Sequence, residues 1–502
     1  MKILRLRQAL LFFMCFILVS MGLPAQEASP QESSPQGENE TASKYKPREQ
    51  NLLIDIPLTL AEDTAINLIG NFAWRLWGPD AHVAYFTFDS VRRNLNFASS
   101  WHWEEGRGGD AFITEQIFHP FAGAYYFASA RSNNFNYYLS VLSAYLGSLQ
   151  WETFGETGWP SKNDNISATF GGVVIGEVLH RLFLELDKCG TGGRIGASFV
   201  SPTDRVTAAI RGYGPEPGPL NISRSSLAFG FSWLYAQFYE TGDTTLGWNR
   251  PSAYVDFSLV YGDPFTAHSK TPFDQFNLDI SLIGAIPLIY SVTFMPNGYL
   301  ASWLLADDEV NQASNGISIH YDCFSTVKGT FIDLNNGREN LGFAGGSLDY
   351  AIKWSHNINS SWDFSLVSYL GFTPWANQTY NGGIDKDDYN LFSYGGNIKL
   401  FLELRQMKEN IPMKNGQSLT LGLCFYETWR FPFYSMAFNN YKSFLYSMLT
   451  YSLPLTGNLS LYIADNFNFM HIDPIGKNTA AVFPPITRWF NNAQIGIKIS
   501  LI

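Results

Sequence analysis

The chain has 502 residues, of which 15% are charged and 16% aromatic, and its formal net charge is −11. Despite this aromatic content, its mean hydropathy is only −0.07. Beyond the N-terminus the longest apolar run is Ser281–Phe294, which contains Pro287, so a protein with several membrane-spanning helices is excluded. The acidic balance, with an isoelectric point near 5.2, argues against a nucleic-acid-binding protein.

The N-terminal residues 1–25 are typical of a secretory signal peptide. A basic region with Lys2 and Arg7 precedes an apolar segment over residues 10–19, and Ala25 ends a small-residue cleavage site. An uncleaved membrane anchor is the alternative, but the apolar segment is short for a span. Residues 26–50 are polar and rich in Ser and Pro, which is typical of a disordered linker.

Residues 51–110 are predicted to form a helix followed by a pair of strands. Apolar residues with loosely helical spacing occur at Leu60, Ile66, Ile69 and Trp74. Aromatic residues then alternate with other residues over 81–103, which is typical of strands. We expect this strand pair to join the sheet that the later part of the chain forms.

Residues 111–187 change to a helical pattern and form a predicted helical insert. Pro120 suits the first turn of a helix. A second helix is predicted by the apolar stripe at Leu139, Leu142, Leu146 and Leu149. After a turn at Pro160, a third helix is predicted over residues 165–186, with Asp164 as its N-cap.

Residues 188–502 are predicted to form the strands of a β-barrel. Apolar and polar residues alternate in segment after segment, for example over residues 276–282, 348–354, 398–404 and 419–425. Each segment has about the ten residues with which a tilted strand crosses a membrane. The last strand, over residues 495–501, is expected to close the sheet, because an open edge cannot lie in lipid.

The predicted fold class is therefore mainly β: an outer-membrane-type antiparallel β-barrel of roughly 12–16 strands with an α-helical insert. A soluble secreted β-sandwich also has alternating strands and is the alternative. The barrel is favoured because charged residues are few and because aromatic residues such as Trp375 and Trp429 lie near strand ends. The expected location is the outer membrane, and the expected partner is outer-membrane lipid.

Two helices of the insert carry stripes of small residues. The members, four positions apart, are Ser140, Ala144 and Ser148 on one helix and Ala168, Gly172 and Gly176 on the other. Small residues at this spacing let helix backbones approach closely. We therefore expect these two helices to pack against each other as an antiparallel pair around Pro160, with Glu152 and Glu156 near the turn.

Several short motifs of the insert occur in one order: Asp110-Ala-Phe, His119-Pro-Phe-Ala-Gly-Ala-Tyr-Tyr-Phe, Ala130-Arg-Ser-Asn, Gly147-Ser-Leu-Gln-Trp-Glu, Gly155-Glu, Pro160-Ser-Lys-Asn-Asp and Gly171-Gly-Val-Val-Ile-Gly-Glu. Through these motifs, about residues 95–200 resemble a bacterial family known as domain-of-unknown-function family 3943. The resemblance implies an exported, envelope-associated protein of double-membraned bacteria and supplies no activity. The chain departs from the family pattern at Lys162, where an apolar residue is expected, and at Trp101-His-Trp-Glu, where an aspartate is expected.

One hypothesis for the insert is a membrane-embedded hydrolase that acts on lipid or another cell-envelope substrate. His119 would be the general base and Ser161 the nucleophile. The acid that orients the base would be Glu152, Glu156 or Asp164. The sequence lacks a Gly-x-Ser-x-Gly elbow, and Ser161 is equally well placed to cap a helix.

A metal site is a second hypothesis. Glu177 and His180 have the Glu-x-x-His spacing of carboxylate-bridged sites, but that architecture needs two such pairs on separate helices. Cys189, Cys323 and Cys424 are scattered and form neither a disulfide framework nor a metal cluster in the sequence. We therefore predict no metal and no cofactor.

The leading hypothesis for the insert is structural. Charged residues of the insert would form a buried ion network, with Glu177 and Arg181 paired at i, i+4 and with Glu152 and Glu156 as further members. The residues assigned a structural role are Arg131, Asn163, Thr169, Gly172, Gly176, Glu177 and Arg181. The helices would plug the barrel or cap its periplasmic mouth. A gated channel, an assembly scaffold and an envelope-maintenance factor all fit this description.

Overall fold

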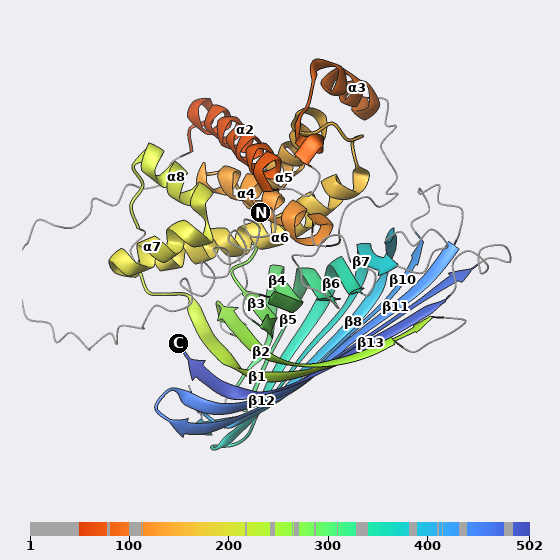
Figure 1. The fold of residues 1–502 in the computed structure, drawn as a ribbon. Coiled ribbons are helices and arrows are strands. Elements are labelled where there is room, and N and C mark those ends of the chain that lie inside the picture. Colours follow the sequence, from red (N-terminus) through yellow and green to blue (C-terminus); the bar gives the residue numbers. More distant parts are fainter. Residues whose placement is uncertain are drawn as a thin grey trace, which may run out of the picture.

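The computed structural model describes residues 50–77, 81–99, 112, 114–215, 218–240, 246–263, 265, 271–285, 288–308, 310–327, 340–380, 389–408, 411–413, 415–430, 439–475 and 485–502. The predicted signal peptide, its cleavage site at Ala25 and the linker up to residue 49 lie outside these residues, as does the departure from the family pattern at residues 101–104. The described chain forms an N-terminal helical domain, residues 52–211, followed by a C-terminal barrel, residues 222–500 (Figure 1).

The helical domain consists of α2 (Leu52–Trp77), η1 (Ala81–Ala84), α3 (Phe88–Ser99), η2 (Thr114–Phe118), α4 (His119–Ser132), α5 (Tyr137–Gln150), η3 (Trp151–Gly155), α6 (Lys162–Asp187), α7 (Gly190–Val200) and α8 (Pro202–Arg211). Local signals set the helix ends. The Ser161 hydroxyl accepts the backbone N–H of Asp164 and caps α6. Gly212 follows α8 with a φ of 69°, the left-handed conformation that ends many helices.

The barrel strands are β1 (Ile222–Glu240), β2 (Leu246–Tyr261), β3 (Phe276–Ala285), β4 (Leu288–Asp307), β5 (Asn311–Val327), β6 (Asn340–Asn359), β7 (Trp362–Tyr380), β8 (Tyr389–Lys408), β9 (Ile411–Pro412), β10 (Ser418–Arg430), β11 (Asn439–Thr456), β12 (Leu459–Ile475) and β13 (Ile486–Ser500). Sequential strands pair antiparallel, β8 pairs with β10, and β13 pairs with β1. Apart from the short β9, twelve strands therefore close into a barrel, which confirms the predicted fold class.

The two faces of the barrel wall differ in the way that alternation predicts. On β6, Phe343 points into the lumen and packs on Phe444 of β11, whereas Leu348 and Tyr350 point outward and are exposed. Lumen-facing aromatic residues from β2, β5, β6, β10, β11 and β12 belong to one buried cluster. Because these strands come from several parts of the ring, their side chains meet inside the lumen.

Short turns join some consecutive strands at the end of the barrel. At the turn between β4 and β5, the backbone N–H groups of Asn311 and Val310 donate to the carboxylate of Asp308. These two hydrogen bonds lower the pKa of the exposed Asp308 carboxyl group, because they favour its charged form. The same hydrogen bonds hold the turn closed.

The helical domain packs against the outer face of the barrel wall. On β5, Phe324 belongs to the lumen cluster, while its neighbour Cys323 and the nearby Tyr321 belong to a second cluster shared with α4 and α6. Successive side chains of a strand point to opposite faces, so the helices lie on the face opposite the lumen. Figure 1 shows them beside the strand ends from β3 to β7. The sequence left open whether the helices plug the barrel or cap its mouth, and the contacts described above lie on the outward face of β5.

Two predicted boundaries are corrected. Residues 81–99 form η1 and α3 and are not a strand pair, because the polar residues that follow Phe88 repeat with a helical period. The barrel begins at Ile222 and not at residue 188, because residues 190–211 form α7 and α8. Both α7 and α8 are short and contain Gly, Ser or Thr, which hides their helical period from a pattern search.

Candidate functional site

Beside its apolar core the helical domain buries many polar groups, and α2 supplies several of them. Asp63 accepts hydrogen bonds from Ser129 of α4 at 2.6 Å and from Ser143 of α5 at 2.8 Å. Its neighbour Glu62 accepts from Asn133 at 2.8 Å and from Thr207 of α8 at 2.6 Å. These contacts join α2, α4, α5 and α8 through hydrogen bonds to two buried carboxylates, which we call the α2 carboxylate cluster (Glu62, Asp63).

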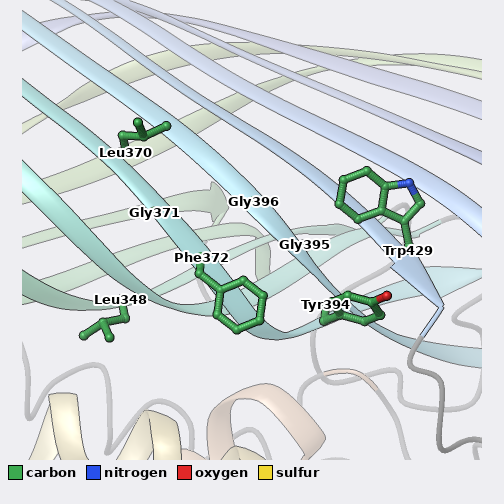
Figure 2. A pocket seen from close by; sticks show the side chains of 8 residues that line it. All are labelled: Leu348, Leu370, Gly371, Phe372, Tyr394, Gly395, Gly396 and Trp429. Atoms are coloured by element: carbon green, nitrogen blue, oxygen red, sulfur yellow. The ribbon is translucent and has the colours of Figure 1, made fainter.

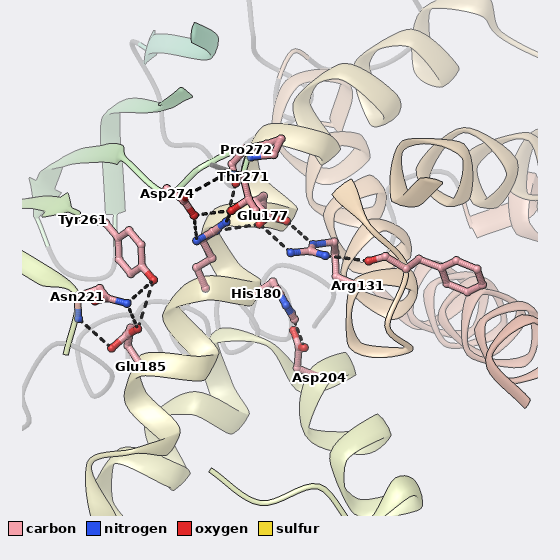
Figure 3. Close-up of polar contacts among 12 residues, drawn as sticks. Arg131, Glu177, His180, Glu185, Asp204, Asn221, Tyr261, Thr271, Pro272 and Asp274 are labelled. Atoms are coloured by element: carbon pink, nitrogen blue, oxygen red, sulfur yellow. Dashed lines mark hydrogen bonds and ion pairs between the residues drawn. The ribbon is translucent and has the colours of Figure 1, made fainter. Parts of the chain in front are cut away.

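A second buried group of charges centres on Glu177 of α6, which has no exposed surface. Arg131 of α4 donates to both of its oxygens, at 2.6 and 3.1 Å. Arg181, one turn later on α6, donates to Glu177 at 2.9 Å and to Asp274 before β3 at 3.2 Å. Figure 3 shows Arg131, Glu177 and Asp274 in this arrangement. The Glu177–Arg181 pairing predicted from the sequence is present, and it connects the helical domain to the barrel.

Two further polar contacts tie α6 to its surroundings. His180 Nδ1 lies 2.7 Å from a carboxylate oxygen of Asp204 on α8, whose other oxygen accepts from Ser201 at 2.6 Å. Glu185 accepts from the backbone N–H of Asn221 at 3.2 Å, just before β1, and from the hydroxyl of Tyr261 on β2 at 3.3 Å (Figure 3). The helix therefore meets α8 on one side and the barrel on the other.

The residues proposed for a hydrolase gather at the N-terminal end of α6. His119 Nε2 lies 3.6 Å from Asp164, and the Glu152 carboxylate accepts the backbone N–H of Ser161 at 2.7 Å. Ser161 Oγ, however, accepts the Asp164 N–H as the cap of α6. Glu156 lies half-buried, and its backbone carbonyl accepts from Asn94. These contacts are those of a helix start, so they give the hydrolase hypothesis no support.

The N-terminal end of α6 also contacts the barrel wall. Asn163 donates to the buried carboxylate of Glu115 on η2 and accepts from the indole N–H of Trp375 on β7 at 3.4 Å. Tyr321 of β5 stacks on Trp375 and donates to the backbone carbonyl of Gln116 at 2.7 Å. Asn163 thus has the structural contacts expected of it, and Glu115 is a partner that the sequence pattern did not reveal.

The small-residue stripe of α6 faces α4, which corrects the predicted pairing with α5. A Cβ added at Gly172 would lie 2.5 Å from the backbone of Gly123 on α4, and one added at Gly176 would lie 2.8 Å from the Phe127 ring. The prediction failed because α4 also carries small residues, and Gly123 is the one that Gly172 approaches. The nearby Thr169 hydroxyl is buried and makes no hydrogen bond within the described residues.

Glu177 and His180, the predicted metal-ligand pair, take separate partners. Arginine side chains surround Glu177, while His180 contacts Asp204. The described residues contain no group of three His, Cys, Asp or Glu side chains arranged to hold a metal ion. Glu177 and His180 therefore belong to two separate polar contacts in the described part of the chain.

Three solved barrel structures are similar to the chain at low identity. The NanC porin shares 8% identity with a TM-score of 0.23, covering 53% of this chain and 99% of its own. The toluene transporter TodX of Pseudomonas putida shares 6% identity with a TM-score of 0.23, covering 56% and 90%. The translocator domain of the autotransporter NalP from Neisseria meningitidis shares 10% identity with a TM-score of 0.22, covering 59% and 93%.

The helical domain contains the segment that is similar to a known family. A comparison with curated proteins finds no match for the chain. Residues 101–203, which include α4, α5 and α6, match the family described as domain of unknown function DUF3943, and this match confirms the resemblance that the sequence motifs indicated.

Proposed function

We propose that this protein is an outer-membrane barrel with a closed lumen that supports the helical domain in an envelope-maintenance role. The observation that carries the proposal is an ion pair across the lumen. Arg224 of β1 donates to both oxygens of Glu403 on β8, at 2.8 and 3.0 Å. Between β1 and β8 lie six strands on one side of the ring and four on the other, so the pair bridges nearly opposite walls.

Further lumen contacts support a closed interior. Lys399 of β8 donates to Asp322 of β5 at 2.6 Å and lies 3.2 Å from Asp349 of β6. Tyr426 of β10 also donates to Asp322. A barrel of this strand number has room for a ligand or a narrow channel, but here side chains from facing walls meet in that space. This arrangement favours the scaffold over the gated channel.

The outer face supports membrane insertion with lipid as the partner. Leu370, Phe372 and Ile398 are more than half exposed on β7 and β8. Figure 2 shows Leu348, Leu370 and Phe372 on the outer wall, beside a shallow groove that continues between Tyr394 and Trp429. On β12, separated from β8 by β10 and β11, the exposed Asp465 interrupts this apolar surface. Exposure of so much apolar surface is costly in water and favourable in a bilayer.

The test measures membrane insertion and conductance of the purified full chain. We expect heat-modifiable migration in detergent gels, recovery in the outer-membrane fraction, and no ion conductance above background in planar bilayers. The double variant Arg224→Ala with Glu403→Ala removes the bridging pair and is the matched comparison for conductance. Recovery as a soluble protein without detergent would sink the membrane assignment, and porin-like conductance of the unmodified protein would refute the closed scaffold.

A further inference from the structure

Helix α2 has the opposite polarity to a helix on the surface of a water-soluble domain. Its buried residues are all polar: Asp55, Thr59, Glu62, Asp63, Asn67 and Asn71. Its exposed residues are all apolar: Leu52, Leu53, Ile54, Ile56, Pro57, Leu60, Ala61, Ala65, Leu68, Ile69, Phe72 and Leu76. Leu53 is 89% exposed and Ile69 is 69% exposed. In water such a helix would turn its apolar side inward.

Helices α5 and α8 repeat this inverted arrangement. On α5 the exposed residues are Tyr138, Leu139, Leu142 and Leu146, while Ser140, Ser143 and Ser148 are buried. On α8 the exposed residues are Pro202, Val206, Ala209 and Ile210, while Thr203, Asp204 and Thr207 are buried. Three helices of one domain therefore expose apolar side chains and bury polar groups, although α5 and α8 also bury Tyr137, Ala144 and Ala208.

The inward polar groups of α2 find side-chain or backbone partners inside the domain, as a medium without water requires. Asp55 pairs with Arg211 of α8 at 2.5 Å, and Asn67 donates to the Gly147 carbonyl of α5 at 3.1 Å. Asn71 donates to the Ala84 carbonyl at 2.9 Å. In hydrocarbon an unpaired polar group costs several kcal/mol, so a lipid-facing bundle keeps such groups inside and paired.

The position of the domain agrees with its polarity. The helical domain covers outward-facing barrel residues such as Tyr321 and Phe276. Other outward-facing residues, on the same or neighbouring strands, stay exposed, for example Ile317 and Leu348. The apolar helix faces and the apolar barrel wall therefore belong to one outer surface. Helix α6, at the centre of the bundle, is long and apolar enough to cross a membrane and is mostly buried.

We infer that the helical domain lies within the bilayer beside the barrel, with the apolar faces of α2, α5 and α8 against lipid acyl chains. This inference rests on the membrane location in the proposed function. We assign lipid as the partner of these apolar faces because the faces occur on three helices and continue onto the barrel wall. A second copy of the chain would cover only a bounded patch.

The experiment places nitroxide spin labels at single cysteines in a Cys189→Ser background, because Cys189 is exposed and Cys323 and Cys424 are buried. The test positions are Leu68 and Leu142 on the helices. Leu370, 64% exposed on the outer wall of β7, is the lipid control, and Ser360 in the exposed turn between β6 and β7 is the water control. Each variant must first show heat-modifiable migration.

Collision rates with oxygen and with a neutral nickel chelate are measured in vesicles of phosphatidylethanolamine and phosphatidylglycerol. Oxygen concentrates in hydrocarbon and the chelate in water. We expect the oxygen-to-nickel ratio at Leu68 and Leu142 to lie within about twofold of Leu370 and roughly tenfold above Ser360, since polar solutes are excluded from hydrocarbon.

Each other outcome has a defined meaning. If Leu370 reports lipid while Leu68 and Leu142 report water, the inference fails and the proposed membrane barrel stands. If the helix labels are shielded from both agents, a protein surface covers them and the lipid assignment is overturned; chemical crosslinking between Leu68→Cys chains would identify that surface as a second copy. If Leu370 reports water, the proposed function fails together with the inference.

Discussion

Glu177 shows how a charge is accommodated inside the helical domain. Its carboxylate is fully buried and contacts the guanidinium groups of Arg131 and Arg181, each of which makes a further contact with a backbone carbonyl or another carboxylate. A buried ion is tolerated only when its partners compensate for lost hydration. The arrangement is specific as well, because arginine donors match both carboxylate oxygens.

Replacing Glu177 by Ala should therefore destabilise the protein strongly. The change leaves two buried guanidinium groups without their carboxylate, which typically costs about 3–5 kcal/mol. The measurement is the urea concentration at half-loss of the heat-modifiable form in detergent. Asp89→Ala, at an exposed carboxylate in the first turn of α3, is the control and should change this midpoint little. Equal midpoints for both variants would show that the ion cluster contributes nothing to stability.

At the scale of elements, the contact between α4 and α6 depends on glycine. Gly172 and Gly123 bring the two backbones so close that an added methyl group has no room. Two polar contacts also join these helices directly, Arg131 with Glu177 and His119 with Asp164. The close approach also allows Arg131 to reach across to α6.

Gly172→Ala should lower stability by about 1–3 kcal/mol, because the helices must separate to admit the methyl group. Gly70→Ala is the control: its Cβ would meet only a Trp151 ring atom at 3.5 Å, and alanine favours the helix. Urea midpoints of the two variants and the unmodified protein give the comparison. A stable Gly172→Ala protein beside an unchanged Gly70→Ala protein would contradict the close packing.

The sequence predicted strands better than it predicted helices. Strands such as residues 398–404 were recognisable because apolar residues form the outward face and polar residues face the lumen, so the polarity alternates with period two. The buried side of helix α2 was harder to predict. We expected apolar residues on that side, but Glu62 and Asp63 lie there. The regular recurrence of polar residues from Asp55 to Asn71 was the signal that could have identified this network.

The placement of the candidate residues depends on tertiary contacts that spacing does not contain. His119 and Asp164 are separated by 45 positions, yet they meet because α4 and α6 cross closely. The assignment of Gly172 and Gly176 to tight packing was correct in kind, but the partner helix was α4. Small residues indicate that a helix makes a close contact, whereas the partner helix depends on the tertiary fold.

At the scale of the whole molecule, the barrel wall and the helical domain form one continuous structure. Arg181 and Glu185 reach the barrel at β2, β3 and the segment before β1, while Asn163 reaches β7. Phe170 of α6 lies against Gly346 of β6, where any side chain would intrude. These contacts come from both ends of α6, so the domain is held along its length.

Gly346→Leu should weaken docking of the helical domain and leave the barrel intact. An added Cβ would lie 2.3 Å from the Phe170 ring, and such overpacking typically costs about 1–3 kcal/mol. Gly396→Leu, also on the outer wall, is the control, because its Cβ would meet only the Gly371 carbonyl at 3.5 Å. We expect faster protease cleavage within residues 52–211 of the Gly346 variant, with heat-modifiable migration retained. Identical cleavage rates in both variants would exclude this docking contact.

The mixed polarity of α2 has a consequence for export. A chain bound for the outer membrane first crosses the inner membrane unfolded, where a sufficiently apolar helix is retained, and each carboxylate near a helix centre opposes retention by about 2.5–3.5 kcal/mol. Glu62 and Asp63 lie near the middle of α2, and Asp55 lies near its start. Under the proposed outer-membrane location, the carboxylates that hydrogen-bond inside the folded domain would also oppose retention of α2 in the first membrane.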